Sequence, residues 1–355
     1  MQPIKISPRS PDRSDPMSAD PKGPLYSTTP VVRTGERVAP LIVVGLPRSG
    51  SSFLAHVLSG IEDWYVFDDL FMLRHARSIG CDGDLTPAQL ENLVRFLGWQ
   101  LRARIRWPSF DPPNCEWEEV DAIEEALLTT FRKHAITWDG LLEEWMTRLA
   151  HHHGCKRWGY KAPQDFMNAD ELIASFPGVQ FVFLVRDPRK VMASKKYVDG
   201  EDGTPGEYHP VIYARYWRMS VEAAFEIREK IGDRILMMKF EDLVGDPNQA
   251  AEELATFLGS KFSGDVQRDK GNTSFTGKQR KGLTALEERI CEKVAGETML
   301  DLGYELRKPK PQAADLLDLA WRSCRFTWSQ LRRFVTNGDA RQSIMMFIRS
   351  LFRGK

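Results

Sequence analysis

The sequence predicts an α/β fold of the P-loop type, with three layers in which helices cover both faces of a mainly parallel central sheet. Short apolar runs of strand length, at residues 41–44, 179–185 and 235–240, alternate with segments whose apolar residues recur at helical spacing. The first two runs are rich in branched apolar residues, as expected of strands buried on both faces. Strands that alternate with helices in this way form parallel sheets.

The composition fits a large globular protein. The chain has 355 residues, 42% of them apolar and 28% charged, which is enough for a substantial core. A formal net charge of zero gives no reason to expect a nucleic acid partner. The five cysteines are scattered and form no CxxC pair, which argues against a disulfide framework and favours a reducing compartment. No apolar segment has the length of a signal peptide or a membrane span, so we expect a cytoplasmic protein.

The chain divides into regions of different composition. Residues 1–38 are rich in Pro, Ser and charged residues and are expected to form a disordered leader. The main domain is expected over residues 39–306. Within it, residues 86–152 predict mostly helices, beginning at Thr86-Pro87, and we interpret them as an insertion that covers the functional site. Residues 307–355 form a basic tail.

The segment from Gly45 to Ser52, with the sequence GLPRSGSS, connects the first predicted strand to a predicted helix. A loop of backbone amides followed by a helix N-terminus binds anions, because the amides and the helix dipole both favour negative charge. The loop differs from a Walker A loop, since no Lys follows Gly50 and the basic residue, Arg48, precedes it. The residues expected to bind the anion are Arg48, Ser49, Gly50, Ser51 and Ser52.

Two carboxylates follow the next predicted strand, which covers residues 64–67. Asp68 and Asp69 therefore lie where open α/β sheets place their functional sites. The alternative is that the pair caps the following helix.

Four segments, in order along residues 41–305, together resemble the PAPS-dependent sulfotransferases (PAPS is 3′-phosphoadenosine-5′-phosphosulfate). They read PRSGSS, WGYKAP, RDPRKVMAS and MKFEDLVGDP, and Leu302-Gly303-Tyr304 is similar to the family's closing motif. The pattern is closest to the tyrosylprotein and carbohydrate sulfotransferases. Each segment alone is a weak match, whereas their joint order and spacing are specific.

The resemblance implies how the donor is bound. The loop would hold the 5′-phosphosulfate, and Arg186 with Ser194 would hold the 3′-phosphate, for which the planar donors of Arg are suited. Arg186 could instead pair with Asp187. The basic segment Arg280, Lys281 and Gly282 is similar to the element that closes over the 3′-phosphate in cytosolic sulfotransferases. A solvent-exposed charged loop would have the same kind of sequence.

The resemblance also implies the catalytic groups. Lys161 would stabilise the leaving oxygen, with Arg48 as the second cation. In tyrosylprotein sulfotransferases the general base is a Glu, and the corresponding position here is Asp69, with Asp68 beside it. The shorter side chain is a departure from the family pattern. His56 is a rival base, although its helical position favours a packing role. Sulfuryl transfer requires no metal.

Two other functions stay open from the sequence. One is a P-loop kinase for a small molecule, with Asp187 as the magnesium-binding acid, although the missing Lys after Gly50 argues against it. The other is a non-catalytic nucleotide-binding module. The acceptor of a sulfotransferase cannot be read from these residues: a small molecule, a glycan and a lipid all fit, and the acceptor group would be a hydroxyl or an amine.

The tail, residues 307–355, has eleven Lys and Arg against three Asp, a net charge of +8, so the rest of the chain carries −8. Its aromatic and aliphatic residues alternate with arginines in a pattern that predicts two basic amphipathic helices. Peripheral contact with the inner membrane surface through residues 313–352, packing on the main domain and formation of a homodimer are the alternatives.

Overall fold

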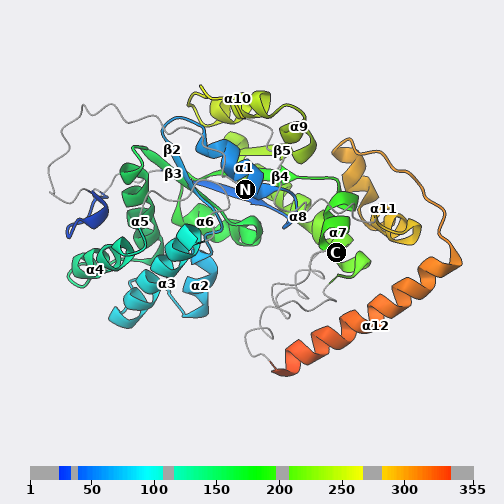
Figure 1. Ribbon diagram of the computed structural model, residues 1–355, viewed down its shortest axis with the longest axis horizontal. Coiled ribbons are helices and arrows are strands. Elements are labelled where there is room, and N and C mark those ends of the chain that lie inside the picture. The colour runs from blue at the N-terminus through cyan, green and yellow to red at the C-terminus, as the bar shows by residue number, and fades with distance from the viewer. Residues whose placement is uncertain (1–23, 33–38, 107–115, 197–207, 267–281, 337–355) are drawn as a thin grey trace.

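The computed structural model describes most of the chain and provides the architecture in Figure 1. The described residues are 24–32, 39–106, 116–196, 208–266 and 282–336. The strands are β1 (Leu41–Gly45), β2 (Trp64–Phe67), β3 (Arg157–Lys161), β4 (Gln180–Val185) and β5 (Ile235–Lys239).

The helices follow the strands along the chain. They are α1 (Ser51–Ser59), α2 (Met72–Ser78), α3 (Pro87–Arg106), α4 (Glu119–Phe131), α5 (Trp138–His152), α6 (Ala169–Ser175), α7 (Pro188–Lys196), α8 (Pro210–Ile231), α9 (Phe240–Gly245), α10 (Pro247–Phe257), α11 (Ala285–Asp301) and α12 (Ala313–Thr336). Short 3-10 helices are η1 (Pro24–Tyr26), η2 (Pro163–Asn168) and η3 (Gly232–Arg234).

The sheet has the strand order β2-β3-β1-β4-β5, and all neighbouring strands are parallel. The predicted parallel α/β fold is therefore confirmed. In the register, Val43 of β1 pairs with Lys161 of β3, and Gly45 pairs with Leu184 of β4. These pairings bring the ends of the three central strands to the same edge of the sheet.

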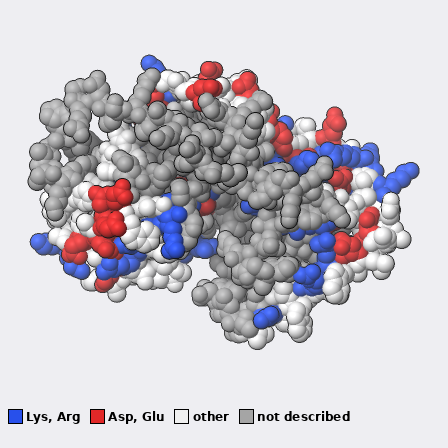
Figure 2. All heavy atoms as spheres, viewed as in Figure 1, with Lys and Arg blue, Asp and Glu red and all other residues white. Residues whose placement is uncertain are grey.

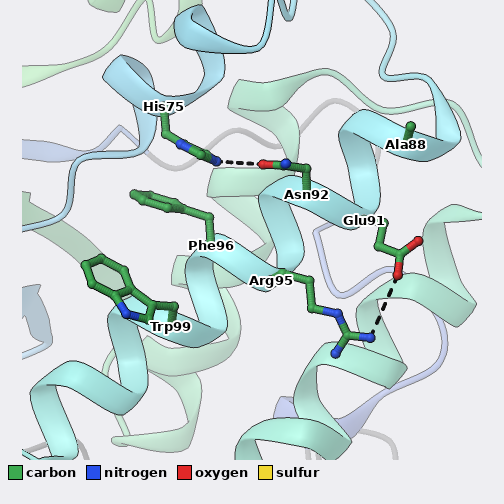
Figure 3. A pocket seen from close by; sticks show the side chains of 7 residues that line it. All are labelled: His75, Ala88, Glu91, Asn92, Arg95, Phe96 and Trp99. Atoms are coloured by element: carbon green, nitrogen blue, oxygen red, sulfur yellow. Dashed lines mark hydrogen bonds and ion pairs between the residues drawn. The ribbon is translucent and has the colours of Figure 1, made fainter. Parts of the chain in front are cut away.

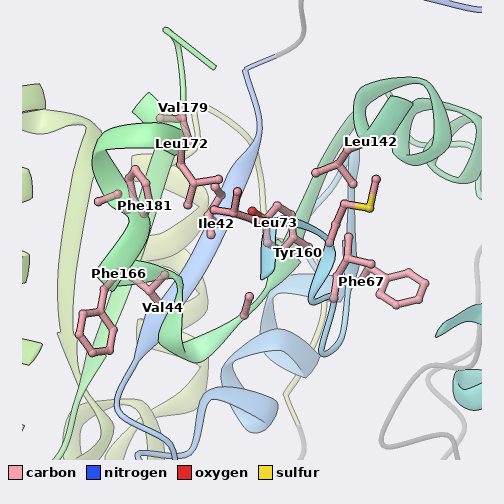
Figure 4. Close-up of a cluster of buried hydrophobic side chains, with 14 of the residues drawn as sticks. Ile42, Val44, Phe67, Leu73, Leu142, Tyr160, Phe166, Leu172, Val179 and Phe181 are labelled. Atoms are coloured by element: carbon pink, nitrogen blue, oxygen red, sulfur yellow. The ribbon is translucent and has the colours of Figure 1, made fainter. Parts of the chain in front are cut away.

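Alternate residues of β1 enter two different cores. Leu41 and Val43 pack with α1, α9 and α10, which lie together on one face of the sheet. Ile42 and Val44 face the opposite side, where the core includes residues of α5, α6 and α8 (Figure 4). All four side chains are fully buried, as predicted for a strand covered on both faces.

Local sequence signals fix several helix starts. Thr86 and Gln89 hydrogen-bond reciprocally at the beginning of α3, with the Gln89 amide donating to Thr86 Oγ1 and the Thr86 amide donating to Gln89 Oε1. The Asp187 carboxylate accepts from the Arg189 amide at the start of α7, and Asp246 caps α10 by accepting from the Gln249 amide. The helix start at Thr86-Pro87 is as predicted.

Part of the expected disordered leader is packed against the insertion. Residues 24–32 lie on α4 and α5, with Leu25 fully buried. The guanidinium of Arg148, which is itself fully buried, donates to the backbone oxygens of Ser27 and Thr29. Glu144 holds this guanidinium at 2.6 Å and accepts the amides of Val31 and Val32. The prediction of disorder is wrong for these residues, because the buried Leu25 side chain and the backbone groups bound by Arg148 and Glu144 anchor them.

The tail begins with one long helix, α12, which extends along the side of the molecule away from the sheet (Figure 1). The second predicted helix of the tail falls outside the described residues. Among the described helices, none combines the length and the apolarity needed to cross a membrane.

Candidate active site

The candidate active site lies at the carboxyl ends of the parallel strands, where open α/β sheets bind ligands. The loop at residues 46–50 follows β1, Asp68 and Asp69 follow β2, Lys161 ends β3 and Arg186 follows β4. The strand order places these four chain segments next to one another.

The loop after β1 depends on two glycines. Gly50 has φ 99°, and a Cβ there would lie 2.2 Å from a ring carbon of Phe240. A Cβ at Gly45 would lie 2.5 Å from the carbonyl oxygen of Leu184 on the neighbouring strand. Both positions need glycine, because the loop is pressed against the sheet and against the chain after β5.

The start of α1 has the features of an anion site. Its N-cap is Gly50, which supplies no side-chain hydrogen bond. The first amides of such a helix need an external acceptor. The hydroxyl of Ser49 is buried without a hydrogen-bond partner among the described residues, and Ser51 is also buried. An anion in the loop would supply acceptors for these donors.

Lys161 joins the loop to the two carboxylates. Its ammonium group lies 2.6 Å from Asp69 Oδ1 and 2.8 Å from Asp68 Oδ1, and it donates to the Ser52 hydroxyl at 2.9 Å. The side chain is only 3% exposed. A buried ammonium ion needs such partners, because removal from water is costly for a charged group.

The Asp pair does not cap the next helix, which was the alternative interpretation. The N-cap residue of α2 is Phe71, and it makes no side-chain cap. Asp69 adopts φ 56°, a backbone conformation that is uncommon outside glycine. The side chain of Asp69 is 30% exposed and that of Asp68 is 15% exposed. Asp69 is thus the more accessible carboxylate of the pair.

Arg104 is a member of the site that the sequence does not reveal. It lies in the last turn of α3, and its Nη1 is 3.7 Å from Asp68 Oδ2 and 3.9 Å from Asp69 Oδ2. No motif marks this arginine, and only the packing of the insertion against the sheet brings it to the carboxylates. The region 86–152 therefore places a cation beside the two carboxylates.

A second group of cations lies at the end of β4. Arg48 Nε donates to Ser194 Oγ at 3.2 Å, and Arg186 Nη1 donates to the backbone oxygen of Arg48 at 3.2 Å. The Arg186 guanidinium stacks over the ring of Phe240, 4.3 Å from its centroid. The predicted pair Arg186 and Ser194 is thus brought together with the loop through Arg48.

The electrostatics of this second group favour an anion. Burial lowers the pKa of Arg186, the neighbouring charge of Arg48 acts in the same direction, and Glu241 opposes both. An arginine remains protonated near neutral pH even so. Two partly buried guanidinium groups near each other would be stabilised by a bound phosphate.

The alternative partner of Arg186, Asp187, is engaged elsewhere. Its carboxylate lies 2.8 Å from Arg189 Nη2, and its backbone amide donates to Glu241. Arg189 also contacts Glu292 of α11 at 3.4 Å. The contact between Arg189 and Glu292 links α7 to α11 near the end of the domain. The pair between Arg189 and Asp187 occupies the carboxylate that would bind magnesium in the kinase interpretation.

The remaining predicted residues are less informative. Arg280 and Lys281 lie outside the described residues, and Gly282 is exposed ahead of α11. His56 lies in α1, where its ring is 6.4 Å from that of Phe53, in agreement with a packing role. A separate, open surface hollow of about 540 Å³ lies along α3, with His75 of α2 at its side (Figure 3). Phe96 stacks on His75 there, with 4.0 Å between the ring centroids.

Comparison with protein families identifies the class of protein that this fold and site define. Residues 40–264, more than half of the chain, match the sulfotransferase family. The chain belongs to the sulfotransferase family. The family and the enzyme class predicted from the motifs, a sulfotransferase, are confirmed. Among curated protein sequences, none gives a significant match.

Solved structures similar to this chain include several sulfotransferases. The sulfotransferase domain of the curacin biosynthetic pathway has a TM-score of 0.50 and 17% identity, over 76% of this chain and 100% of that one. A sulfotransferase from Mycobacterium avium has a TM-score of 0.42 and 15% identity, over 77% and 79%. A mouse sulfotransferase, determined with PAP (3′-phosphoadenosine 5′-phosphate), has a TM-score of 0.33 and 12% identity, over 89% and 90%. The first of these matches supports the sulfotransferase fold.

Proposed function

We propose that the enzyme transfers the sulfuryl group of PAPS to a hydroxyl or amine of its acceptor, by in-line attack with Asp69 as general base. The observation that carries this proposal is the position of Lys161. Its ammonium group contacts both Ser52 of the loop and Asp69, so a single cation lies between the predicted donor site and the predicted base.

The donor would be held at two anion sites. The first is the loop, with residues 48–52 and the start of α1 around the 5′-phosphosulfate. The second is Arg186 with Ser194, which Arg48 connects to the loop. The 3′-phosphate would lie there, and Arg280, Lys281 and Gly282 would close over it. A donor with two phosphates fits two anion sites, one at the loop with Lys161 and one at Arg186, with Arg48 between them, better than a triphosphate does.

The chemistry then follows from these positions. The acceptor atom forms a bond to sulfur while the bond between sulfur and the 5′-phosphate oxygen breaks. The electron pair of the broken bond stays on the phosphate oxygen, where Lys161 and Arg48 would stabilise the negative charge. Asp69 takes the proton that the acceptor loses. The scheme is balanced without a metal ion.

The acceptor would approach from the side of the insertion. Arg104 of α3 lies within 4 Å of both carboxylates, and Asp69 is the more exposed of the two. We propose that Arg104 positions the Asp69 carboxylate toward the acceptor. Small-molecule, glycan and lipid acceptors all remain compatible with this arrangement.

Calorimetric titration with PAP, ATP and ADP tests the donor assignment. We expect PAP to bind more tightly than either ATP or ADP, and Arg186→Ala to abolish tight PAP binding, because Arg186 is assigned to the 3′-phosphate. Arg234→Ala is the control, since Arg234 lies in η3, which precedes β5 and is therefore at the end of the sheet opposite to the candidate site. Equal affinities for PAP and ATP would contradict the proposal and favour the kinase alternative.

A further inference from the structure

Within the described part of the chain, α12 contacts the main domain through the side that carries Ser323 and Phe326. The Ser323 hydroxyl lies 3.1 Å from His209 Nε2, and the Phe326 ring centroid lies 5.5 Å from that of His209. Both His209 and these two tail residues are partly buried. On the same side, Arg322 pairs with Asp318 within the helix at 2.7 Å.

The opposite side of α12 carries an exposed apolar stripe. Its residues follow one another at intervals of three and four, so they share one face and fall within an arc of about 80° at 100° per residue. Five of them are between 55% and 75% exposed. The stripe consists of Leu317, Trp321, Cys324, Trp328, Leu331 and Val335.

An amphipathic helix on a globular domain ordinarily buries its most apolar face. Here the outward face is the apolar one, and the inward contacts include the polar side chain of Ser323. Contiguous exposed apolar surface of this kind marks an interaction site. The question is which partner covers it.

The charges beside the stripe distinguish the two main candidates. Arg325 and Arg332 lie along one edge of it and are exposed, and Figure 2 shows basic side chains next to uncharged ones over the part of this face where α12 lies. A second copy packed in parallel along the same stripe would place Ala320 and Thr327 opposite these arginines, with no carboxylate to pair with them. An anionic lipid surface would supply phosphates to them.

The composition of the region agrees with a lipid surface. Two of the stripe residues are tryptophans, which favour the boundary between headgroups and acyl chains. The tail carries a net charge of +8, which repels a second tail and attracts anionic lipid. We propose that α12 lies on an anionic membrane, with the stripe Leu317, Trp321, Cys324, Trp328, Leu331 and Val335 inserted among the lipids and Arg325 and Arg332 at the headgroups.

Flotation of the full-length protein with vesicles tests this proposal. We expect binding to vesicles that contain phosphatidylglycerol, weaker binding to vesicles of phosphatidylcholine alone, and weakening by salt. The double variant Trp321→Asp/Trp328→Asp should lose about tenfold or more in vesicle affinity. Trp99→Asp is the matched control, because Trp99 is also an exposed tryptophan, at 59%, but lies on α3. PAP affinity, measured in parallel, shows that each variant is folded.

A label on Cys324 provides a second measurement. With Cys115 changed to Ser, the exposed Cys324 carries an environment-sensitive fluorophore, since Cys81 and Cys291 are buried and burial raises the pKa of Cys155 to about 11. We expect a blue shift on addition of anionic vesicles.

Equal vesicle binding by wild type and the double variant would overturn the proposal. A second result would also overturn it: no vesicle binding by the wild type, together with a wild-type dimer in analytical ultracentrifugation that is absent in the double variant. That result would assign the stripe to a second copy.

Discussion

The Lys161 ammonium lies 2.6 Å from Asp69 Oδ1, and this contact joins the carboxyl end of β3 to the chain that leaves β2. The same ammonium reaches Ser52 in the first turn of α1. A buried cation thus connects the loop that would hold the donor with the carboxylate that would accept the proton. Because the Lys161 side chain contacts both the loop and the Asp69 carboxylate, substitutions at these positions should have specific effects.

Removal of the Lys161 charge should abolish most of the activity. We expect Lys161→Met to lower kcat by about 10²–10³-fold, the usual effect of the loss of one preorganised group that stabilises transition-state charge. Steady-state kinetics with labelled PAPS measure it. Lys156→Met is the control, because Lys156 precedes the same strand but is 81% exposed and pairs with Asp63 at 3.9 Å. Equal losses in the two variants would remove Lys161 from the mechanism.

Gly50→Ala should damage both the fold and donor binding. At φ 99° the new Cβ would overlap the Phe240 ring, so the loop or the ring must move. We expect a loss of about 2–4 kcal/mol in the free energy of unfolding, from backbone strain and overpacking together, and weaker PAP binding. Gly83→Ala has a similar φ of 88° but no atom within 4 Å, so it measures strain alone. Urea unfolding and calorimetry separate the two effects. Identical stabilities of the two variants would show that the contact with Phe240 is unimportant.

Asp165 should make stability depend on pH. Burial raises its pKa from the ordinary 3.8 to about 7, and Tyr160 donates a hydrogen bond to it at 3.3 Å. Between these two pH values the folded protein holds a proton that the unfolded chain has lost, so the free energy of unfolding falls as pH rises from about 4 to about 7.

The variant Asp165→Asn cannot titrate and should lack this contribution. The difference in free energy of unfolding, variant minus wild type, should therefore increase between pH 4 and pH 8, by at most about 4 kcal/mol. Urea unfolding at several pH values measures the difference. Parallel curves for the two proteins would mean that Asp165 has an ordinary pKa in the folded state.

Local signals explain how much of the fold could be predicted. The buried β1 has branched apolar residues on both faces, and the capping residues Thr86, Asp187 and Asp246 act on amides two or three positions away. Interactions of this range are visible in the sequence. The loop and Lys161 can be predicted because a recognisable motif surrounds each of them.

The parts that could not be predicted depend on contacts between distant residues. Arg104 reaches the carboxylates only because α3 packs against α2 and α4, and nothing near it in sequence marks that contact. Residues 24–32 have the composition of a disordered segment, yet their carbonyl groups satisfy Arg148, more than a hundred residues later. Backbone carbonyls have no signature in the sequence, so this anchor becomes visible only in three dimensions.

The substitution Asp69→Asn tests the central claim most directly. Asparagine tolerates the left-handed backbone of Asp69 at φ 56°, and Asp63→Asn, at φ 66°, is the matched control. In acceptor screening with labelled PAPS followed by single-turnover kinetics, we expect Asp69→Asn to retain PAP affinity and to lose about 10²–10⁴-fold in transfer rate, as expected for a general base. A transfer rate unchanged from wild type would contradict the account and place the base elsewhere.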